Sequence, residues 1–466
     1  MNDSLLRLYH RLPASTRSVA ASLRGLHLYS WRYGPETERM VEEALERESW
    51  SPDQWKTWQE TRLAYTLRRA ATWVPYYREQ WAVQRHQGDR ISWKYLENWP
   101  ILEKEPLREN STAFIASDCS IRHMFHEHTS GTTGKSLDLW WSQETVRTWY
   151  ALNEARCRRW YGVSRHDRWA ILGGQLVTPV GQRRPPFWVW NVALHQLYMS
   201  SYHLAPDLIP HYLDALKNYH VKYLWGYTSS LYALAQEALQ LGRDDLKMAV
   251  VITNAEPVFD YQRQAIAEAF QCPVRETYGM AEIVAAASEC ESGRLHLWPE
   301  VGWVEILENN QPVSNGTSGD LVCTGLLNVD MPLIRYHIGD RGALPGVNTP
   351  CACGRTLPIL ASVEGRVDDM LYTPDGRRIG RLDPIFKTRL PVREAQVIQE
   401  TLNRVHVRYV PAPDFTPEAG RSIIDRLQAR MGMIEVILEQ VDEVPREVNG
   451  KFRPVICNLP RRSGSI

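Results

Sequence analysis

Short apolar runs and amphipathic helical patterns alternate along the middle of the chain, and this alternation limits the fold more than any other feature of the sequence. The sequence predicts, in order, a helix over Asp207–Tyr219, a strand over Lys222–Trp225, a helix over Thr228–Leu241 closed by Gly242, a strand over Met248–Thr253, a helix begun by Pro257 and a strand just before Tyr278. Strands that alternate with helices at this spacing indicate an α/β sheet covered by helices. Ligands bind such sheets at the loops that leave the carboxyl ends of the strands.

Two of these loops carry a carboxylate beside a turn of small residues. The first is Asn254-Ala255-Glu256-Pro257, which follows the apolar run Val250-Val251-Ile252. The second extends from Glu276 to Glu282 and reads ETYGMAE. Both loops are therefore candidate ligand-binding positions.

A third loop, upstream of this region, has the composition of a phosphate-binding loop. Residues 128 to 136 read HTSGTTGKS, which combines hydroxyl side chains, two glycines and a lysine. Hydroxyls and backbone N–H groups can surround an anion while the ammonium neutralises it. The GxxxxGK[ST] nucleotide motif fits poorly, because Thr129 stands in place of the first glycine and residues 124 to 128 are not the apolar strand that should precede it. An ordinary surface turn remains the alternative.

The composition is that of a soluble globular protein with two or three domains. The chain has 466 residues, 44% of them hydrophobic, and equal numbers of basic and acidic residues at 54 each. This balance removes the usual electrostatic argument for a nucleic-acid partner. The sequence has no stretch of about 18 apolar residues and no signal-peptide pattern, so we expect a cytoplasmic location and no transmembrane segment.

The N-terminal segment is basic and amphipathic. Residues 4 to 33 contain five arginines and no acidic residue, interleaved with leucines. We expect a helical arm packed on its own domain, and peripheral contact with an anionic membrane surface is the alternative. Residues 36 to 73 predict two helices, the second capped by Ser51, opened by Pro52 and ended before Val74-Pro75.

The remaining segments predict shorter elements. Leu137–Trp141 alternates like a strand, Ser142 caps the helix that follows, and Gly162 is expected to end that helix. Residues 302 to 345 predict short strands and turns, with a hairpin at Asn315-Gly316. Within them Asp340 follows an apolar run and has the bidentate carboxylate that could accept both hydroxyls of a ribose, although alone it is typical of a turn.

Cysteine and tryptophan usage leaves two further alternatives open. The eight cysteines are too dispersed for a disulfide scaffold, so reduced thiols are expected and metal binding is their only collective role to test. Among the 18 tryptophans, the pairs Trp140-Trp141 and Trp188-Trp190 are expected in the core, with the lining of an organic-substrate pocket as the alternative.

Five motifs, TSGTTGK, NAEP, TYGMAE, RYHIGD and EGRVDDML, are followed by the lysine of NGK near the C-terminus. In this order and at this approximate spacing they resemble the adenylate-forming enzymes, the superfamily of acyl-CoA synthetases, adenylation domains and luciferases. The chain looks most like the phenylacetate-CoA ligase branch, and within it the CapK-type members found with capsular polysaccharide genes. WVPYYREQW, PILEKEPLREN, MPLIRYHIGD and CxCGR mark this branch.

The resemblance implies an α/β fold with a large multi-layer N-terminal domain over residues 1–365, built of helix-covered sheets plus a β-rich subdomain. It implies a small mobile α+β C-terminal domain over residues 366–466. Without the resemblance, Lys451 in its Gly-bearing turn would be interpreted as a solvated surface residue.

The resemblance also implies roles for individual residues. ATP would be bound by Thr129, Ser130, Gly131, Thr132, Thr133, Gly134, Lys135, Ala255, Glu256, Pro257, Tyr278, Gly279, Met280, Asp340 and Arg366. Glu282 would hold Mg²⁺, Lys451 would stabilise the charge of the transferring phosphoryl group, and Asp368 would be the hinge of the C-terminal domain. Ala281 stands where the family has a hydroxyl, so the resemblance does not extend to the phosphate contact of that hydroxyl.

Relatives of this branch also use cysteines near CxC for zinc. Cys351 and Cys353, together with Cys290 and His296, would form a structural Zn²⁺ site here. The spacing of one residue instead of two weakens the motif, and four buried, reduced side chains are the alternative.

The implied activity is an ATP-dependent carboxylate ligase that forms an acyl-adenylate, releases pyrophosphate and transfers the acyl group to CoA. Transfer of an acyl or aminoacyl group to an amine or hydroxyl in polysaccharide or secondary-metabolite biosynthesis is the alternative. A non-catalytic scaffold of polysaccharide assembly is disfavoured, because it has no use for Lys451, Asp340 and Glu282 together.

Overall fold

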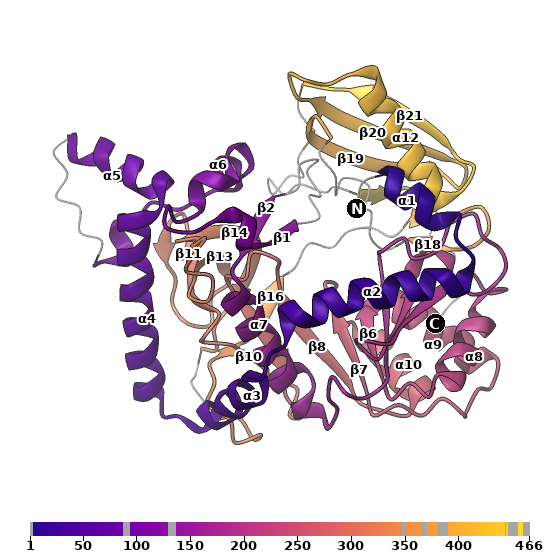
Figure 1. Cartoon of the computed structure of the whole chain (residues 1–466), viewed down its shortest axis with the longest axis horizontal. Helices are drawn as coiled ribbons and strands as arrows, with labels where there is room; N and C mark the ends of the chain where they lie inside the picture. The colour runs from indigo at the N-terminus through magenta and orange to yellow at the C-terminus, as the bar shows by residue number, and fades with distance from the viewer. Residues whose placement is uncertain are drawn as a thin grey trace.

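A computed structural model of the chain describes residues 3–86, 94–128, 137–346, 350–364, 371–379, 390–442, 444–445 and 455–459. Figure 1 shows a mixed α/β body with a second group of strands and one helix above it. This architecture confirms the predicted fold class. None of the helices described here combines the length and the apolar character needed to cross a bilayer.

A nine-stranded sheet forms the centre of the body, in the order β15-β10-β9-β8-β7-β6-β3-β5-β4. The strands are β3 (Trp169–Gly173), β4 (Trp188–Asn191), β5 (Gln196–Ser200), β6 (Tyr223–Tyr227), β7 (Val250–Asn254), β8 (Val274–Gly279), β9 (Ala286–Glu289), β10 (Leu295–Leu297) and β15 (Ile359–Leu360). Strands β5, β3, β6, β7 and β8 are parallel. Their carboxyl ends therefore meet at one edge of the sheet.

The helices between these strands occur where the sequence predicts them. They are α8 (Ile209–Asn218), α9 (Thr228–Gln240) and α10 (Asp260–Phe270). The predicted start of α10 at Pro257 is wrong by three residues. Phe259 is extended, and its backbone N–H donates to the side-chain oxygen of Gln262 at 3.1 Å, which fixes the first turn of the helix at Asp260.

The N-terminal helices pack on this body. They are α1 (Asp3–His10), α2 (Ala14–Arg32), α3 (Thr37–Glu46), α4 (Pro52–Trp73) and α5 (Pro75–His86). Ser51 caps α4 by accepting from the Gln54 N–H at 3.2 Å, as the sequence predicts. Helix α2 lies across the sheet beside β4 (Figure 1), and the Tyr9 hydroxyl donates to the Val177 carbonyl at 3.0 Å. The expected packing of this arm on its own domain is confirmed.

The segments on either side of the predicted phosphate loop pair with each other. Strand β1 (Phe125–His128) is antiparallel to β2 (Asp138–Trp141), and Ser142 then caps α7 (Gln143–Cys157). Residues 125 to 128 therefore form a strand, although their sequence is not the apolar strand that a GxxxxGK[ST] loop would follow. Helix α7 ends at Cys157 and not at Gly162, which follows one further helical turn with φ of 70°. Residues 129–136 lie outside the described residues.

A five-stranded antiparallel sheet follows, in the order β12-β11-β13-β14-β16. Its strands are β11 (Gly302–Glu308), β12 (Gln311–Pro312), β13 (Gly319–Gly325), β14 (Tyr336–Ala343) and β16 (Ser362–Glu364). The predicted hairpin at Asn315-Gly316 is wrong. The two-residue turn is Asn309-Asn310, where both φ angles are positive (52° and 62°), as a turn between twisted strands requires.

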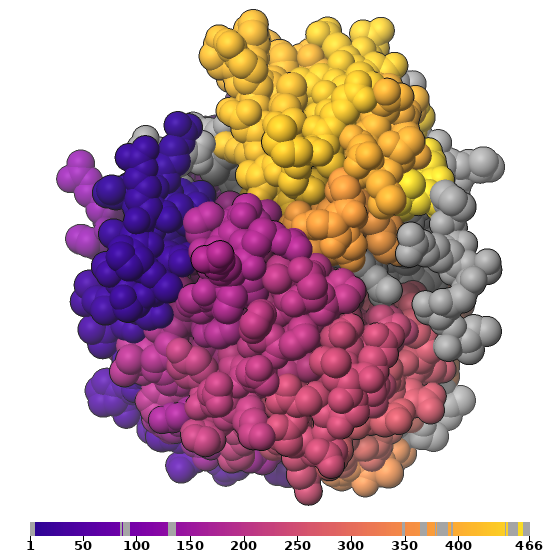
Figure 2. Space-filling model, turned by 90° about the vertical axis from the view of Figure 1, so that its right-hand side faces the viewer, coloured from indigo at the N-terminus to yellow at the C-terminus, as the bar shows by residue number. Residues whose placement is uncertain are grey.

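The C-terminal strands form a separate four-stranded sheet, β21-β20-β19-β22, covered by α12 (Pro417–Met431). The strands are β19 (Val392–Thr401), β20 (Arg404–Pro411), β21 (Glu435–Gln440) and β22 (Val455–Cys457). Figure 2 shows this part as a lobe projecting above the body. Buried Arg377 joins the two, since its guanidinium donates to the carbonyls of Tyr202 at 2.5 Å and Arg430 at 2.8 Å.

Candidate functional site

Tyr278 and Asp340 meet at the carboxyl edge of the parallel strands. The Tyr278 hydroxyl at the end of β8 donates to Asp340 Oδ2 at 2.9 Å. Burial raises the pKa of Tyr278 well above its usual value of 10, and the negative charge of Asp340 adds to this effect. Tyr278 therefore remains protonated at neutral pH and holds the carboxylate of Asp340 in place.

A bulge in β14 turns Asp340 toward β8. Val322 of β13 pairs with His337 and Asp320 pairs with Arg341, so Leu321 alone faces the three residues 338–340. Gly339, within the bulge, has φ of 85°, a conformation that favours glycine. Bulges of this kind redirect side chains. The Gly-Asp pair of the RYHIGD motif therefore has a structural reason: the glycine allows the bend that presents the aspartate.

Glu282 lies on the turn that follows β8. The Ile283 N–H donates to the Met280 carbonyl at 3.1 Å, and Ile283 has φ of 51°. Buried Tyr336 donates its hydroxyl to Glu282 Oε1 at 3.0 Å. The structure thus links the TYGMAE and RYHIGD motifs twice, through Tyr278 with Asp340 and through Tyr336 with Glu282.

Glu256 has a different environment. Its carboxylate accepts from the Ser229 N–H at 2.7 Å and from the Ser229 hydroxyl at 3.1 Å, at the first turn of α9. An anion is stabilised at a helix N-terminus. These contacts hold the loop of Ala255, which has φ of 65°, and Pro257 beside the end of β7. Nearby, the Asn254 side-chain oxygen is buried without a hydrogen-bond partner among the described residues, so it is an acceptor for a ligand donor.

Several predicted site residues lie outside the described residues. These are the loop residues Thr129 to Lys135, together with Arg366, Asp368 and Lys451. The residues that can be assessed are those of β7, β8, β14 and their loops. Among them the structure brings Tyr278, Gly279, Glu282 and Asp340 to one edge of the sheet, while Met280 packs against the main core.

Cys290, His296, Cys351 and Cys353 form a compact cluster, with all four ligand atoms within 4.8 Å of one another. The Cys290 and Cys351 sulfurs are 3.6 Å apart, and His296 Nε2 is 3.5 Å from the Cys353 sulfur. Pairing of β9, β10 and β15 brings the two sequence regions together. The predicted juxtaposition is therefore confirmed.

The chemistry of this cluster fits a tetrahedral metal. His296 Nδ1 lies 3.0 Å from the Leu357 carbonyl, so an Nδ1–H tautomer leaves Nε2 free to bind a cation. Burial lowers the pKa of His296, which favours the neutral, ligating ring. Burial also raises the pKa of the Cys290 thiol to about 11, so a thiolate here needs a positive charge beside it.

Glu276 lies on β8, one residue before the TYGMAE motif. Its contact is within the sheet, because its N–H donates to Glu289 Oε2 at 2.8 Å. Burial, and then repulsion from Glu289, raise the pKa of Glu276 to about 7. A carboxyl with a raised folded-state pKa binds protons better in the folded protein, so stability falls as pH rises from about 4.5 to about 7.

We therefore expect Glu276→Gln to raise the melting temperature by a few degrees at pH 8, with a smaller effect at pH 5. Thermal unfolding of both proteins across this pH range measures the effect. Asp260→Asn, which changes an exposed carboxylate at the start of α10, is the control. An equal shift at both pH values would contradict the assignment.

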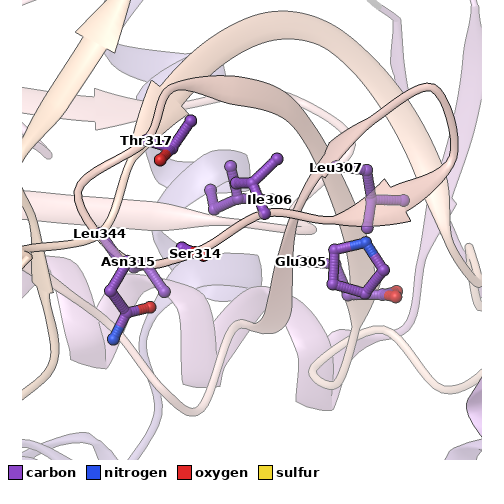
Figure 3. A pocket seen from close by; sticks show the side chains of 9 residues that line it. Glu305, Ile306, Leu307, Ser314, Asn315, Thr317 and Leu344 are labelled. Carbon is purple, nitrogen blue, oxygen red and sulfur yellow. The ribbon is translucent and has the colours of Figure 1, made fainter.

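The cavity shown in Figure 3 lacks the polar and titratable side chains that meet at the ends of β7 and β8. It has a volume of about 130 Å³ and is lined by β11, β12 and the segment that follows. Glu305, the one titratable residue in the described lining, is already paired with Arg335 at 3.1 Å. This cavity is therefore not a candidate active site.

Comparison with known proteins finds CapK and phenylacetate-coenzyme A ligases among the relatives of this chain. The family model of the CapK C-terminal domain matches residues 371–458. Protein CapK of Staphylococcus aureus is 24% identical over 378 residues, which cover 80% of this chain and 82% of that protein. A phenylacetate-coenzyme A ligase of Pseudomonas putida is 27% identical over 340 residues, which cover 70% of this chain and 73% of the ligase.

Solved structures share the fold. A 2-hydroxyisobutyryl-CoA ligase with 2-HIB-AMP and CoA in the thioesterification state has a TM-score of 0.56 at 20% identity, covering 88% of this chain and 91% of the ligase. The same ligase in the postadenylation state has a TM-score of 0.52 at 18% identity, covering 89% of this chain and 92% of the ligase. These findings support the adenylate-forming superfamily for this chain. Within that superfamily the chain is similar to the phenylacetate-coenzyme A ligases and to CapK.

The structure also shows site features that the sequence motifs did not predict. Tyr336 has no predicted role, yet it binds Glu282; its place inside RYHIGD was the available signal. The contact of His296 with the Leu357 carbonyl could not be predicted, because a backbone group leaves no mark in the sequence. Trp149 of α7 approaches the site as well, since a β-carbon at Gly279 would lie 3.8 Å from its ring.

Proposed function

We propose that the protein activates a carboxylic acid as acyl-AMP, releases pyrophosphate, and transfers the acyl group to coenzyme A. The observation that carries this proposal is the hydrogen bond between Tyr278 and Asp340 beside Glu282, at the carboxyl ends of the parallel strands. Relatives named phenylacetate-coenzyme A ligases support it, as does the likeness to a ligase solved with 2-HIB-AMP and CoA.

In the first half-reaction a carboxylate oxygen of the acid attacks the α-phosphorus of ATP. The bond from that phosphorus to the pyrophosphate oxygen breaks, and pyrophosphate leaves. Asp340 accepts hydrogen bonds from the ribose hydroxyls, while Tyr278 fixes the orientation of this carboxylate. Tyr278 and Gly279 lie along the adenine.

Glu282 is the residue that would hold Mg²⁺. Tyr336 fixes one of its oxygens, and the other has no partner among the described residues, so a cation can be coordinated there. Bound Mg²⁺ neutralises negative charge on the phosphates. The loop of residues 129–135 and Lys451 supply further positive charge and hydrogen-bond donors in this proposal.

In the second half-reaction the thiol of CoA attacks the acyl carbonyl and AMP leaves. We propose residues 366–466 as the domain that rotates between the two steps, with Asp368 as its hinge and Arg366 near the ribose. Rotation would exchange Lys451 for the acyl acceptor at the site. The match of residues 371–458 to the CapK C-terminal domain favours testing an amine or a hydroxyl as a second class of acceptor.

The decisive experiment measures pyrophosphate release from ATP with a panel of carboxylic acids. Each acid is tested without acceptor, with CoA and with hydroxylamine, and products are identified by mass spectrometry. We expect acid-dependent release of pyrophosphate and AMP, and a thioester when CoA is present. Release of ADP and phosphate, or release that no acid stimulates, would contradict the proposal. Adenylation without any thioester would indicate the second class of acceptor.

We further propose that the cluster of Cys290, His296, Cys351 and Cys353 binds one structural Zn²⁺. Elemental analysis of the purified protein is expected to give about one zinc per chain. The double variant Cys351→Ser/Cys353→Ser should lose the metal and unfold at a clearly lower temperature, because metal binding contributes folding free energy. The control is Cys272→Ser, a buried thiol outside the cluster. A metal-free native protein would contradict this proposal.

A further inference from the structure

A large pocket lies next to the proposed active site, between α2, α7 and the strands β3 to β6. Its volume is about 310 Å³. Aromatic side chains dominate its walls: Tyr29 and Tyr33 at the end of α2, Trp149 and Tyr150 on α7, and Trp169 and Trp225 on the sheet. Aromatic walls of this kind fit a flat, largely apolar ligand.

The pocket begins at the candidate site. Trp149, which lines it, has its ring 3.8 Å from where a β-carbon of Gly279 would lie. Trp225, also in its wall, lies on β6, two residues before Tyr227, which pairs with Asn254 of β7. An acid whose carboxylate reaches the site at the ends of β7 and β8 can therefore extend its body into this pocket.

The charge of the lining is one-sided. Among the described residues, the lining includes Arg24, Arg32, Arg158 and Arg165 but no aspartate or glutamate. Two of the four arginines already form ion pairs: Arg158 lies 3.6 Å from buried Glu154, and Arg165 lies 2.6 Å from Glu38. Arg158 and Arg165 therefore stabilise the wall of the pocket through these ion pairs.

The two arginines of α2 are different. Within the described part of the chain, Arg24 and Arg32 have neither a hydrogen bond nor an ion pair from their guanidinium groups; Arg32 lies 4.4 Å from the centre of the Tyr150 ring. Together with Ala21 and Leu28 they follow the spacing of one helix face, and all four line the pocket. Helix α2 thus presents two uncompensated positive charges along the wall of an aromatic cavity.

We propose that this pocket selects an acid with a flat ring and a second anionic group, and that Arg24 and Arg32 bind this second group. The inference rests on the proposed function, because it assigns the body of the activated acid to this pocket. Guanidinium groups pair with carboxylate, sulfonate or phosphate in a bidentate geometry, and a partly enclosed, aromatic setting strengthens such pairs. The rings of Trp149 and Trp225 hold the body of the acid between the two charged ends.

Matched pairs of acids test this selectivity. Phenylacetate and 4-carboxyphenylacetate share a flat ring and differ in the second carboxylate, while hexanoate and adipate form the corresponding flexible pair. Binding is measured by calorimetry without ATP, and adenylation by pyrophosphate release. We expect 4-carboxyphenylacetate to bind at least tenfold more tightly than phenylacetate, and more tightly than adipate.

The variants Arg24→Gln, Arg32→Gln and their combination should remove this preference by weakening the diacid while leaving phenylacetate within about twofold. Arg7→Gln, an exposed arginine of α1 outside the pocket, is the control and should change neither acid. The single variants show which guanidinium meets the second group.

Binding of neither ring acid, equal binding of both, or a preference for adipate over the ring diacid would overturn the inference. So would an equal loss of both ring acids in the double variant. The proposed function fails separately: selective binding of the diacid without acid-dependent pyrophosphate release would leave the pocket assignment standing and refute the ligase. Equal adenylation of monoacids and diacids would support the ligase and refute the pocket assignment.

Discussion

Replacing Asp340 with alanine is expected to lower kcat/KM for ATP by about 10²- to 10⁴-fold. The carboxylate is proposed to accept two hydrogen bonds from the ribose, and hydrogen bonds to charged groups contribute about 1.5–3 kcal/mol each. Two such bonds correspond to this loss in rate, because 1.4 kcal/mol is about a factor of ten. Initial rates of pyrophosphate release as a function of ATP concentration provide the measurement.

Two further variants test whether the loss of kcat/KM is specific to Asp340. Asp320→Ala changes an aspartate of the neighbouring strand β13 that pairs with Arg341 at 3.0 Å, so it should leave ATP use almost unchanged. Tyr278→Phe keeps the ring and removes the hydroxyl that holds Asp340, and we expect a loss of about tenfold in kcat/KM for ATP. If Asp340→Ala and Asp320→Ala had equal effects, Asp340 would have no specific role in binding the ribose.

Much of the parallel sheet could be predicted because its signals are local. The strand over residues 250 to 254 and the helix over residues 228 to 240 each consist of one apolar pattern bounded by turn residues. Ser51 and Ser142 mark helix starts for the same reason, since a capping side chain acts on its own first turn. Patterns of this kind do not depend on distant parts of the chain.

The hairpin was placed wrongly where two turn signals competed, and one strand of the structure lacks an apolar pattern. Asn315-Gly316 is a typical hairpin sequence, yet the tight turn is at Asn309-Asn310, because β12 pairs with β11 and not with β13. Residues 125 to 128 read FHEH, and they form a strand by pairing with the more apolar residues 138 to 141. Pairing partners of this kind are invisible to a local pattern.

The candidate site also has parts that could be predicted from the sequence and parts that could not. The motifs containing Tyr278, Glu282 and Asp340 were recognisable by resemblance, and the cysteine pair 351 and 353 was a weak metal signal. Their meeting depends on contacts between residues far apart in sequence, such as the pairing of β10 with β15 that places His296 beside Cys353. The pocket of Arg24 and Trp149 had no motif, because its walls come from α2, α7 and the sheet.

Lys451→Ala is expected to reduce acyl-adenylate formation by about 10²- to 10³-fold, the size of effect seen when one group that stabilises transition-state charge is removed. The role comes from the resemblance, since residue 451 lies outside the described residues. Its ammonium would act on the charge that develops as pyrophosphate leaves, and this charge exists only in the first half-reaction. Thioester formation from a supplied acyl-adenylate should therefore stay within a few-fold of the parent protein.

Single-turnover kinetics of the two half-reactions separate these outcomes. Adenylation is followed by pyrophosphate release, and thioester formation starts from synthetic acyl-adenylate and CoA. Lys56→Ala, an exposed lysine on α4, is the control for loss of a positive charge and should change neither step. Circular dichroism confirms that each variant is folded. If both half-reactions slowed equally, Lys451 would serve binding or folding of the C-terminal region, because a charge needed only for adenylation cannot affect an acyl transfer that begins after pyrophosphate has left.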